Sequence, residues 1–390
     1  MIDFDFEEFC SGCAACYSIC PKKAISMQKN QEGFLIPHID KDKCINCNLC
    51  NKVCVHLNPP SKRNISGCWT YASKNSNVKK KSSSGAAWFE IGKHAINEGG
   101  LVAGCVWNKE LRAIHSVGNS MQTLITTQGS KYVQSDMGDV LKDIVIALKK
   151  NNKIVFSGTP CQATAAHNLI VNSSASKYRE NAIIVAVICH GVSSPLAWES
   201  FKTWDEAKHH SKLVSINFRD KSKEGYKKSY CRYEYESGEI VYLPTFLPSS
   251  KWMESTIVYN LAMRNACAHC DCKGIHNSID LILGDWYSQY KGEGTLGTSC
   301  IIACTTRGKN YAESSLENLH NLEYSSVLKD NPLVEKSSFA SPQRKQFFDR
   351  LLNGDNNFWD SIEKLYPPKY KYKKILVKIG LFGLIKKIIG

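Results

Sequence analysis

The opening of the chain, MIDFDFEEFC, lacks both the basic stretch and the apolar core of a secretory signal. We therefore expect a cytoplasmic protein in a reducing environment, where its 18 cysteines are poor candidates for disulfides. The sequence also lacks a low-complexity tract and a basic stripe interleaved with aromatics, so nucleic-acid binding is not expected. Its 390 residues exceed what one hydrophobic core usually spans, so several domains are predicted.

Two cysteine runs near the N-terminus share one spacing, C-x2-C-x2-C-x3-C. The runs are CSGCAACYSICP at residues 10–21 and CINCNLCNKVCV at residues 44–55. This doubled spacing is that of bacterial ferredoxins with two 4Fe–4S clusters, in which the fourth cysteine of each run ligates the other cluster. The predicted ligands are Cys10, Cys13, Cys16 and Cys54 for the first cluster, and Cys20, Cys44, Cys47 and Cys50 for the second. Zinc and disulfides fit this pattern poorly.

Domain boundaries follow from the change in composition after these runs. We expect a two-cluster ferredoxin domain over residues 1–57, a polar linker over 58–66, an α/β body over 67–310 and a helical C-terminal region over 311–390. The predicted fold class is α+β. Apolar β-branched runs at 153–158 and 183–191 are typical of buried strands, and residues 229–244 predict a hairpin turning at Ser237 and Gly238. Strands are also expected at 68–74 and 101–108, with a helix between them.

Four later cysteines lie at positions that the fold can bring close together. Cys161 follows one predicted strand, Cys189 ends another, and Cys267 and Cys270 form a C-x2-C pair. In α/β proteins such positions converge at the carboxyl edge of a sheet, so a further cluster is a hypothesis. The spacing alone also allows small buried packing residues.

Seven short motifs, in this order, resemble the family of beta subunits of coenzyme F420 (deazaflavin) hydrogenases and formate dehydrogenases. They are SSGAA (83–87), KYVQS (131–135), SGTPCQ (157–162), CHG (189–191), FRDK (218–221), RNACAHC (264–270) and GDW (284–286). The resemblance implies an α/β body that holds FAD beside a 4Fe–4S cluster. It also implies that Cys161, Cys189, Cys267 and Cys270 bind a third cluster, with Cys272 as a rival for the fourth position. The remaining five cysteines are expected to be packing residues.

The flavin site is predicted mainly from this resemblance, because no G-x-G-x-x-G follows the first body strand. Ser84 and Gly85 open a helix and are phosphate candidates, although serine before a helix is more often a plain cap. The matched motifs add four cofactor-binding candidates: Lys131, Gly158, Thr159 and Lys221.

Other features leave more than one interpretation open. His190 is as compatible with a structural role as with proton transfer, and no catalytic residue is assigned. Trp286, after Asp285, is expected either to shield a flavin or to fill the core.

The chain carries a formal charge of +14, half of it from seven lysines in the basic apolar tail at 369–390. That tail is too short to span a bilayer comfortably, and predicts either peripheral membrane contact or packing on protein.

We therefore expect an iron–sulfur flavoprotein oxidoreductase. Electrons would pass between a ferredoxin-like carrier, three 4Fe–4S clusters, FAD and a small organic substrate, in either direction, and a surface-polysaccharide pathway is one compatible setting. The alternative is an electron-transfer subunit without its own substrate, docked to a larger hydrogenase or dehydrogenase complex. A non-redox zinc scaffold is the third interpretation.

Overall fold

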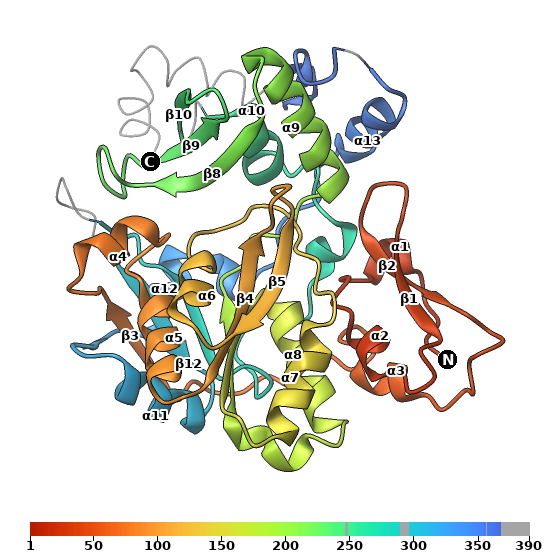
Figure 1. Ribbon diagram of the computed structural model, residues 1–390, viewed down its shortest axis with the longest axis vertical. Helices are drawn as coiled ribbons and strands as arrows, with labels where there is room; N and C mark the ends of the chain where they lie inside the picture. Colours follow the sequence, from red (N-terminus) through yellow and green to blue (C-terminus); the bar gives the residue numbers. More distant parts are fainter. Residues whose placement is uncertain (246–248, 289–295, 356, 368–390) are drawn as a thin grey trace.

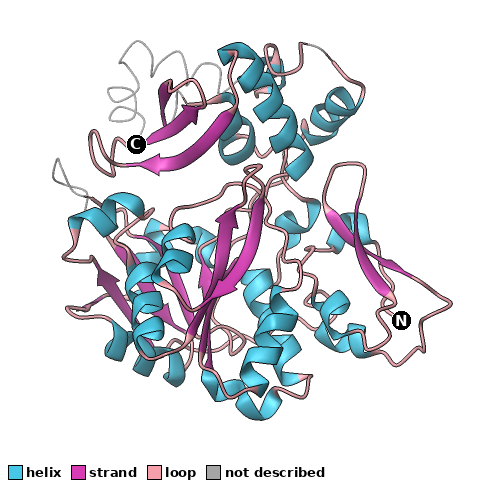
Figure 2. Cartoon of the chain, viewed as in Figure 1, coloured by secondary structure: helices cyan, strands magenta, loops and turns pink. Residues whose placement is uncertain are grey.

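The computed structural model describes residues 1–245, 249–288, 296–355 and 357–367. Three parts are visible: a small N-terminal domain, a large mixed sheet with helices on both faces, and a smaller three-stranded sheet (Figures 1 and 2). The predicted α+β class, with a ferredoxin-type domain ahead of an α/β body, is confirmed.

The N-terminal domain places its two cysteine runs on equivalent helix-and-loop units. Strand β1 (Ile25–Lys29) pairs antiparallel with β2 (Leu35–Ile39). Helices α1 (Phe6–Phe9), α2 (Ala15–Ile19) and α3 (Leu49–Val53) complete it. Helix α2 packs on α3 and also on α7 (Val140–Lys149) and α8 (Pro160–Val171) of the body, so the domain rests on one helical layer (Figure 1).

The large sheet has the order β13-β3-β12-β11-β7-β6-β4-β5. Its strands are β3 (Gly67–Tyr71), β4 (Leu101–Trp107), β5 (Ala113–Gly118), β6 (Ile154–Gly158), β7 (Ala182–Val187), β11 (Leu281–Asp285), β12 (Ser299–Ala303) and β13 (His320–Asn321). Strands β4, β6, β7 and β11 run parallel, and β5 and β12 run antiparallel to their neighbours. All five residues of β6 are buried because helices cover both faces, which explains its continuous apolar run.

Two hydrophobic cores lie on the two faces of this sheet. One joins the sheet to α7 (Val140–Lys149), to α8 (Pro160–Val171) and to the N-terminal domain through Cys13, Ala14 and Val53. The other joins the opposite face to α5 (Ala87–Asn97), α6 (Met121–Thr126) and α11 (Thr306–Ser315). The Asp280 carboxylate connects three elements of the body. It accepts hydrogen bonds from the Ile184 amide, from Arg179 of η1 (Ser176–Asn181) and from Arg307 of α11.

The smaller sheet, in the order β10-β9-β8, carries an aromatic core of its own. Its strands are β8 (Leu213–Asp220), β9 (Tyr230–Tyr235) and β10 (Ile240–Pro244), and β9 and β10 form the hairpin expected at residues 229–244. Helix α9 (Pro195–His209) buries Trp198 and Phe201 against it, together with Trp252 and Trp359. Figure 2 shows this sheet beyond the ends of the large sheet's strands.

Shorter elements complete the described chain. They are α4 (Ser76–Lys81), α10 (Lys251–Met253), α12 (Tyr324–Asp330), α13 (Arg344–Leu352), the π-helix η2 (Glu254–Val258), and the 3₁₀ helices η3 (Asn265–His269), η4 (Pro332–Val334) and η5 (Ile362–Leu365). Strand β13 pairs with β3, so the sheet includes residues beyond 310, while the proposed domain limits stay a prediction. The tail at 369–390 lies outside the described residues. Among the residues described, no helix is long and apolar enough to cross a membrane.

Candidate functional site

A first hollow in the N-terminal domain is ringed by cysteines from both runs. It is also lined by Phe4, Met27 and Val55. Its cysteines are Cys10, Cys13, Cys16 and Cys54. Three of these four thiols are buried. The fold thus brings the last cysteine of the second run to the first three of the first run.

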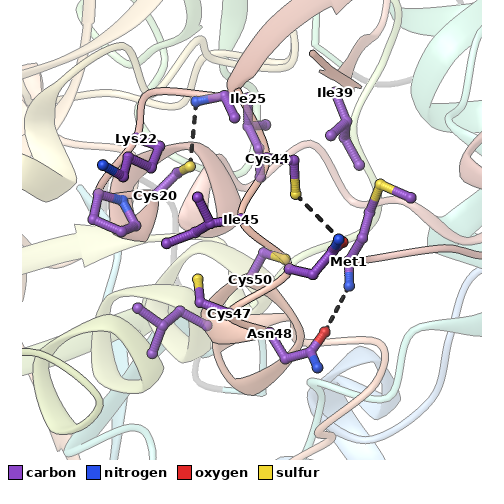
Figure 3. A pocket seen from close by; sticks show the side chains of 14 residues that line it. Met1, Cys20, Lys22, Ile25, Ile39, Cys44, Ile45, Cys47, Asn48 and Cys50 are labelled. Carbon is purple, nitrogen blue, oxygen red and sulfur yellow. Dashed lines mark hydrogen bonds between the residues drawn. The ribbon is translucent and has the colours of Figure 1, made fainter. Parts of the chain in front are cut away.

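A second hollow is ringed by the complementary set (Figure 3). Isoleucines at positions 25, 39 and 45 contribute to its apolar walls. Its cysteines are Cys20, Cys44, Cys47 and Cys50. Four thiols around one hollow match the donor set that 4Fe–4S clusters use in bacterial ferredoxins. Within the described part of the chain, no three His, Cys, Asp or Glu side chains are grouped to hold a single metal ion.

The two loops adopt the same unusual backbone around the second cysteine of each run. Gly12 (φ 66°) and Asn46 (φ 52°) precede that cysteine, and Ala14 (φ 60°) and Asn48 (φ 59°) follow it. Left-handed conformations cost an L-residue such as alanine about 1–2 kcal/mol, so a shared requirement must hold both loops in this form. Wrapping three thiols around one hollow is such a requirement.

Backbone amides point at cysteine sulfurs in all three regions. The Gly12 amide donates to Cys10 Sγ at 3.3 Å, and the Ala24 amide donates to Cys20 Sγ at 3.3 Å. In the body, the Val192 amide donates to Cys267 Sγ at 3.4 Å. Such N–H···S bonds stabilise thiolate charge and help to set the reduction potential of a cluster.

The four scattered cysteines of the body lie together. Cys161 is the second residue of α8, directly after β6, and Cys189 lies two residues past the end of β7. Cys267 lies in η3, and Cys270 ends it. Strands β6 and β7 are parallel neighbours, so both connections leave the same edge of the sheet. Burial raises the pKa of Cys161 well above its ordinary value, and repulsion from Cys270, Cys189 and Cys267 raises it further.

Cys272 lies beside this group but on its α8 side. A hydrogen bond with Cys270, together with burial, raises the pKa of Cys272 well above its ordinary value, and Cys161 adds repulsion. Cys189, by contrast, is repelled mainly by Cys267 and then by Cys270. Cys270 is partly buried like Cys161, Cys189 and Cys267, whereas Cys272 is buried in the hydrophobic core, and Cys270 stays the predicted fourth ligand.

Arg264 connects the third cysteine group to the first hollow. Its guanidinium is buried and donates to the Cys10 carbonyl at 2.5 Å, the Leu35 carbonyl at 3.0 Å and Gln134 Oε1 at 2.8 Å. Gln134 in turn donates to the Ser11 carbonyl at 2.9 Å. Arg264 precedes Cys267 by three residues, so one side chain bridges the two predicted ligand loops.

Lys273 is a second buried cation at the third cysteine group. The residue is 6% exposed, and its Nζ donates to the carbonyls of Cys189 at 2.7 Å and Lys336 at 2.8 Å. Neither Lys273 nor Arg264 has a carboxylate within salt-bridge distance among the described residues. Buried charges normally require a counterion, and a cluster held by four thiolates is negatively charged.

Thr159 and Gly158, two predicted flavin contacts, lie at the start of α8. Thr159 caps this helix in a capping box, because its amide donates to Gln162 Oε1 at 3.0 Å, and Pro160 occupies the first turn. Thr159 Oγ1 lies 3.2 Å from Cys161 Sγ. The motif SGTPCQ thus fixes where Cys161 projects, and these two residues belong with the third cysteine group.

Ser84, Gly85 and Lys221, three further flavin candidates, meet at one place. Lys221 Nζ donates to the Ser84 carbonyl at 2.8 Å and to the Leu296 carbonyl at 2.6 Å, and burial lowers its pKa to about 7. The Gly85 amide donates to Ser299 Oγ at 3.0 Å. A side chain at Gly85 would collide with the Tyr71 carbonyl at 2.3 Å, so glycine permits close strand contact here. These donors are used within the chain, and the residues as they stand do not form a pyrophosphate cradle.

Lys131, the last flavin candidate, makes its hydrogen bonds within its own segment of the chain. Its Nζ donates to the carbonyls of Thr126 at 3.1 Å and Gln128 at 2.8 Å, and burial lowers its pKa to about 8. Its neighbour Ser130 contacts Ser83, the residue before Ser84, at 2.8 Å. The flavin assignment as a whole stays a prediction.

Three residues with open roles now have defined surroundings. His190 Nε2 lies 2.6 Å from Asn260 Oδ1, and burial lowers its pKa. Asp285 pairs with the buried Arg219 at 3.3 Å. Trp286 is buried in the core on the α7–α8 face of the sheet, so it fills space there.

Sequence reasoning missed the roles of Arg264, Gln134 and Lys273. The first two stand inside quoted motifs, RNACAHC and KYVQS, yet only their contacts connect them to Cys10 and Ser11. A lysine three residues after a C-x2-C pair was the available signal for Lys273. The five other body cysteines lie in or next to strands: Cys68, Cys105, Cys231, Cys300 and Cys304.

Two family descriptions match the chain. Residues 9–57 match the 4Fe-4S dicluster domain, and residues 151–325 match the C terminus of the coenzyme F420 hydrogenase/dehydrogenase beta subunit. The chain is therefore an iron–sulfur protein of the electron-transfer class. Residues 151–325 are therefore similar to the C terminus of these beta subunits, and residues 9–57 are similar to dicluster domains.

Three individual proteins are similar to this chain over different lengths. The F subunit of the F(420)H(2) dehydrogenase of Methanosarcina mazei is 22% identical over 284 residues, which cover 67% of this chain and 71% of the relative. A trichloroethene reductive dehalogenase of Dehalococcoides mccartyi is 37% identical over 62 residues, 14% of this chain and 11% of that protein. A chain of the F420-reducing [NiFe] hydrogenase complex of Methanosarcina barkeri has a TM-score of 0.46 and 17% identity, covering 76% of this chain and 95% of that one.

Proposed function

We propose that this chain is an electron-transfer subunit that binds three 4Fe–4S clusters and docks to a larger redox complex. The observation that carries the proposal is the grouping of twelve cysteines into three sets, two around hollows of the dicluster domain and one in the body. The relative from Methanosarcina mazei, which is named as one subunit of a dehydrogenase, supports a role inside an assembly.

Each cysteine set would hold one cluster, which when bound accepts and returns one electron at a time. The sets are Cys20, Cys44, Cys47 and Cys50 at the surface, Cys10, Cys13, Cys16 and Cys54 against the body, and Cys161, Cys189, Cys267 and Cys270 within it. Arg264 holds the loop that begins at Cys10 against the segment that carries Cys267. The buried cations Arg264 and Lys273 would balance the negative charge of the body cluster.

Anaerobic purification with chemical analysis of iron and acid-labile sulfide tests this proposal. We expect about twelve iron atoms per chain from three four-iron clusters. The Cys267→Ser variant should retain about eight, because only one cluster loses a ligand. Cys231→Ala is the matched control, since this buried thiol lies in β9 away from the cysteine sets and should leave the iron content unchanged. Zinc in place of iron would refute the proposal.

The finer proposal is that the chain also binds FAD and itself converts a small organic substrate, with a surface-polysaccharide pathway as one setting. The buried cations Arg219 and Lys221, together with the partly buried Asp285 that pairs with Arg219, support a polar cofactor nearby. The occupied donors of Gly85 and Lys221 count against the pyrophosphate position named above. Flavin extraction from the same preparation decides: about one FAD per chain supports the enzyme, and none supports the subunit without its own substrate.

A further inference from the structure

The two hollows of the dicluster domain differ sharply in their exposure to solvent. Around the first, Cys13 and Cys16 are each 8% exposed, and α2 packs on α7 and α8. Around the second, Cys47 is exposed, and Ile45 beside it is 57% exposed. Figure 3 shows the Ile45 side chain among the cysteines of this set. One cysteine set therefore faces the body, and the other faces outward.

Charge is distributed unevenly over the same domain. Lys22 and Lys23 are exposed directly after Cys20, and no carboxylate lines the second hollow. The acidic residues Glu7 and Glu8 lie instead on α1, next to η3 of the body. Glu8 lies 3.4 Å from His269, and the Glu7 carbonyl accepts a hydrogen bond from Asn265. Asp40 and Asp42 also lie close to Cys44 in the sequence, but Lys41 and Lys43 alternate with them and Lys43 pairs with Asp40, so Lys22 and Lys23 leave the border of the outward set positively charged.

We propose that the outer face, defined as Lys22, Lys23, Ile45, Asn46 and Cys47, docks a small acidic protein that carries a one-electron iron–sulfur centre. This inference rests on the proposed function, because the outer face is useful only if the second cysteine set binds a cluster. One electron crosses between the two centres, the donor is oxidised by one unit and the acceptor reduced by one, and no bond forms or breaks. The exchange is possible in either direction.

The chemistry of the face matches a transient carrier. An exposed isoleucine supplies a small apolar contact, and lysines at the rim attract an acidic partner and raise the rate of encounter. Redox carriers form small, short-lived interfaces below about 1,200 Å², so a large apolar surface is not required. Attraction by exposed lysines is screened by salt, because the Debye length falls to about 3 Å at about 1 M.

Reversal of the two lysine charges tests the face. The Lys22→Glu/Lys23→Glu variant should raise the Kd for a purified acidic plant-type 2Fe–2S ferredoxin about tenfold in calorimetry at low salt. The difference from the unmodified protein should disappear at high salt. The same variant should reduce the basic carrier cytochrome c faster than the unmodified protein does. The two carriers should therefore respond in opposite directions, which a general loss of stability does not produce.

A matched control is Lys149→Glu/Lys150→Glu, which reverses two exposed neighbouring lysines at the end of α7. It should leave the ferredoxin Kd unchanged within a factor of about two. If both double variants weaken ferredoxin binding equally, or if neither weakens it, the proposed docking face is wrong. A dimer of this chain that the Lys22→Glu/Lys23→Glu variant dissolves would also overturn it, since a second copy would then occupy the face. Iron content and reduction by dithionite test the clusters separately. If both are normal and the charge reversal leaves the ferredoxin Kd unchanged, only the docking inference fails.

Discussion

The Arg264 Nε donates a hydrogen bond to the carbonyl oxygen of Cys10, a residue 254 positions earlier in the chain. The same guanidinium reaches Gln134 and Leu35, and it stacks over the Phe34 ring at 5.1 Å. Gly12 allows this approach, because a side chain there would lie 2.7 Å from Arg264 Nη1. The arginine therefore ties the first cysteine loop to the segment that leads to Cys267.

Replacement of this arginine should separate the two cysteine groups without removing a ligand. In Arg264→Gln we expect normal iron content, a loss of about 2–3 kcal/mol in stability from unpaired buried acceptors, and weaker magnetic interaction between reduced clusters. Electron paramagnetic resonance of the reduced protein measures that interaction. Arg344→Gln is the control, because Arg344 holds Glu32 of the β1–β2 turn to the body without contacting a cysteine loop. An identical spectral change in both variants would contradict the specific role of Arg264.

The choice between Cys270 and Cys272 as fourth ligand gives a second prediction. Cys270 forms the C-x2-C pair with Cys267 and is partly buried, as are Cys161, Cys189 and Cys267, whereas Cys272 is buried in the hydrophobic core. Cys270→Ser should therefore lose about four irons per chain, and Cys272→Ser should keep them. Iron analysis of the two variants, prepared side by side, measures this. Retention of iron by Cys270→Ser together with its loss from Cys272→Ser would reverse the assignment.

Sequence spacing predicted local features far better than long-range ones. The hairpin at 229–244 and the strands around Cys161 followed from apolar runs and turn residues, because those signals are local. The bridge through Arg264, and the pairing of β13 with β3, depend on contacts between distant segments that leave no periodic trace. Ser84 and Gly85 stay predicted phosphate contacts, because the sequence alone cannot distinguish a phosphate loop from a glycine that lets two backbone segments approach closely.

Lys273 gives a third prediction, about reduction potential. Its buried ammonium beside Cys189 stabilises added negative charge, so Lys273→Met should shift the potential of one cluster in a negative direction and leave the other two unchanged. Redox titration followed by electron paramagnetic resonance measures each cluster. Lys336→Met is the matched control, because Lys336 is a nearby but exposed lysine whose charge is screened by water. Equal shifts in both variants would show that Lys273 has no special position.

Asp280 gives the last prediction, a pH dependence of folding. This fully buried carboxylate receives hydrogen bonds from Arg179 at 3.0 Å and Arg307 at 2.9 Å, and from the Ile184 amide at 2.9 Å. Burial alone raises its pKa, but the two arginines outweigh burial and hold the pKa below the ordinary 3.8. Its contribution to stability is therefore complete above about pH 4 and is lost as the pH falls through the lowered value.

Asp280→Asn should cost about 3–5 kcal/mol, because it leaves the buried Arg179 guanidinium without its carboxylate and leaves Arg307 with Glu180 alone. Urea unfolding at neutral pH measures this loss. The difference in stability between the unmodified protein and the variant should shrink as the pH is lowered below about 4, because protonation removes the same charge that the substitution removes. Cluster loss in acid affects both proteins alike and cancels in that difference. A difference that stays constant down to the acid transition would show that the charge of Asp280 is not what joins β7, η1 and α11.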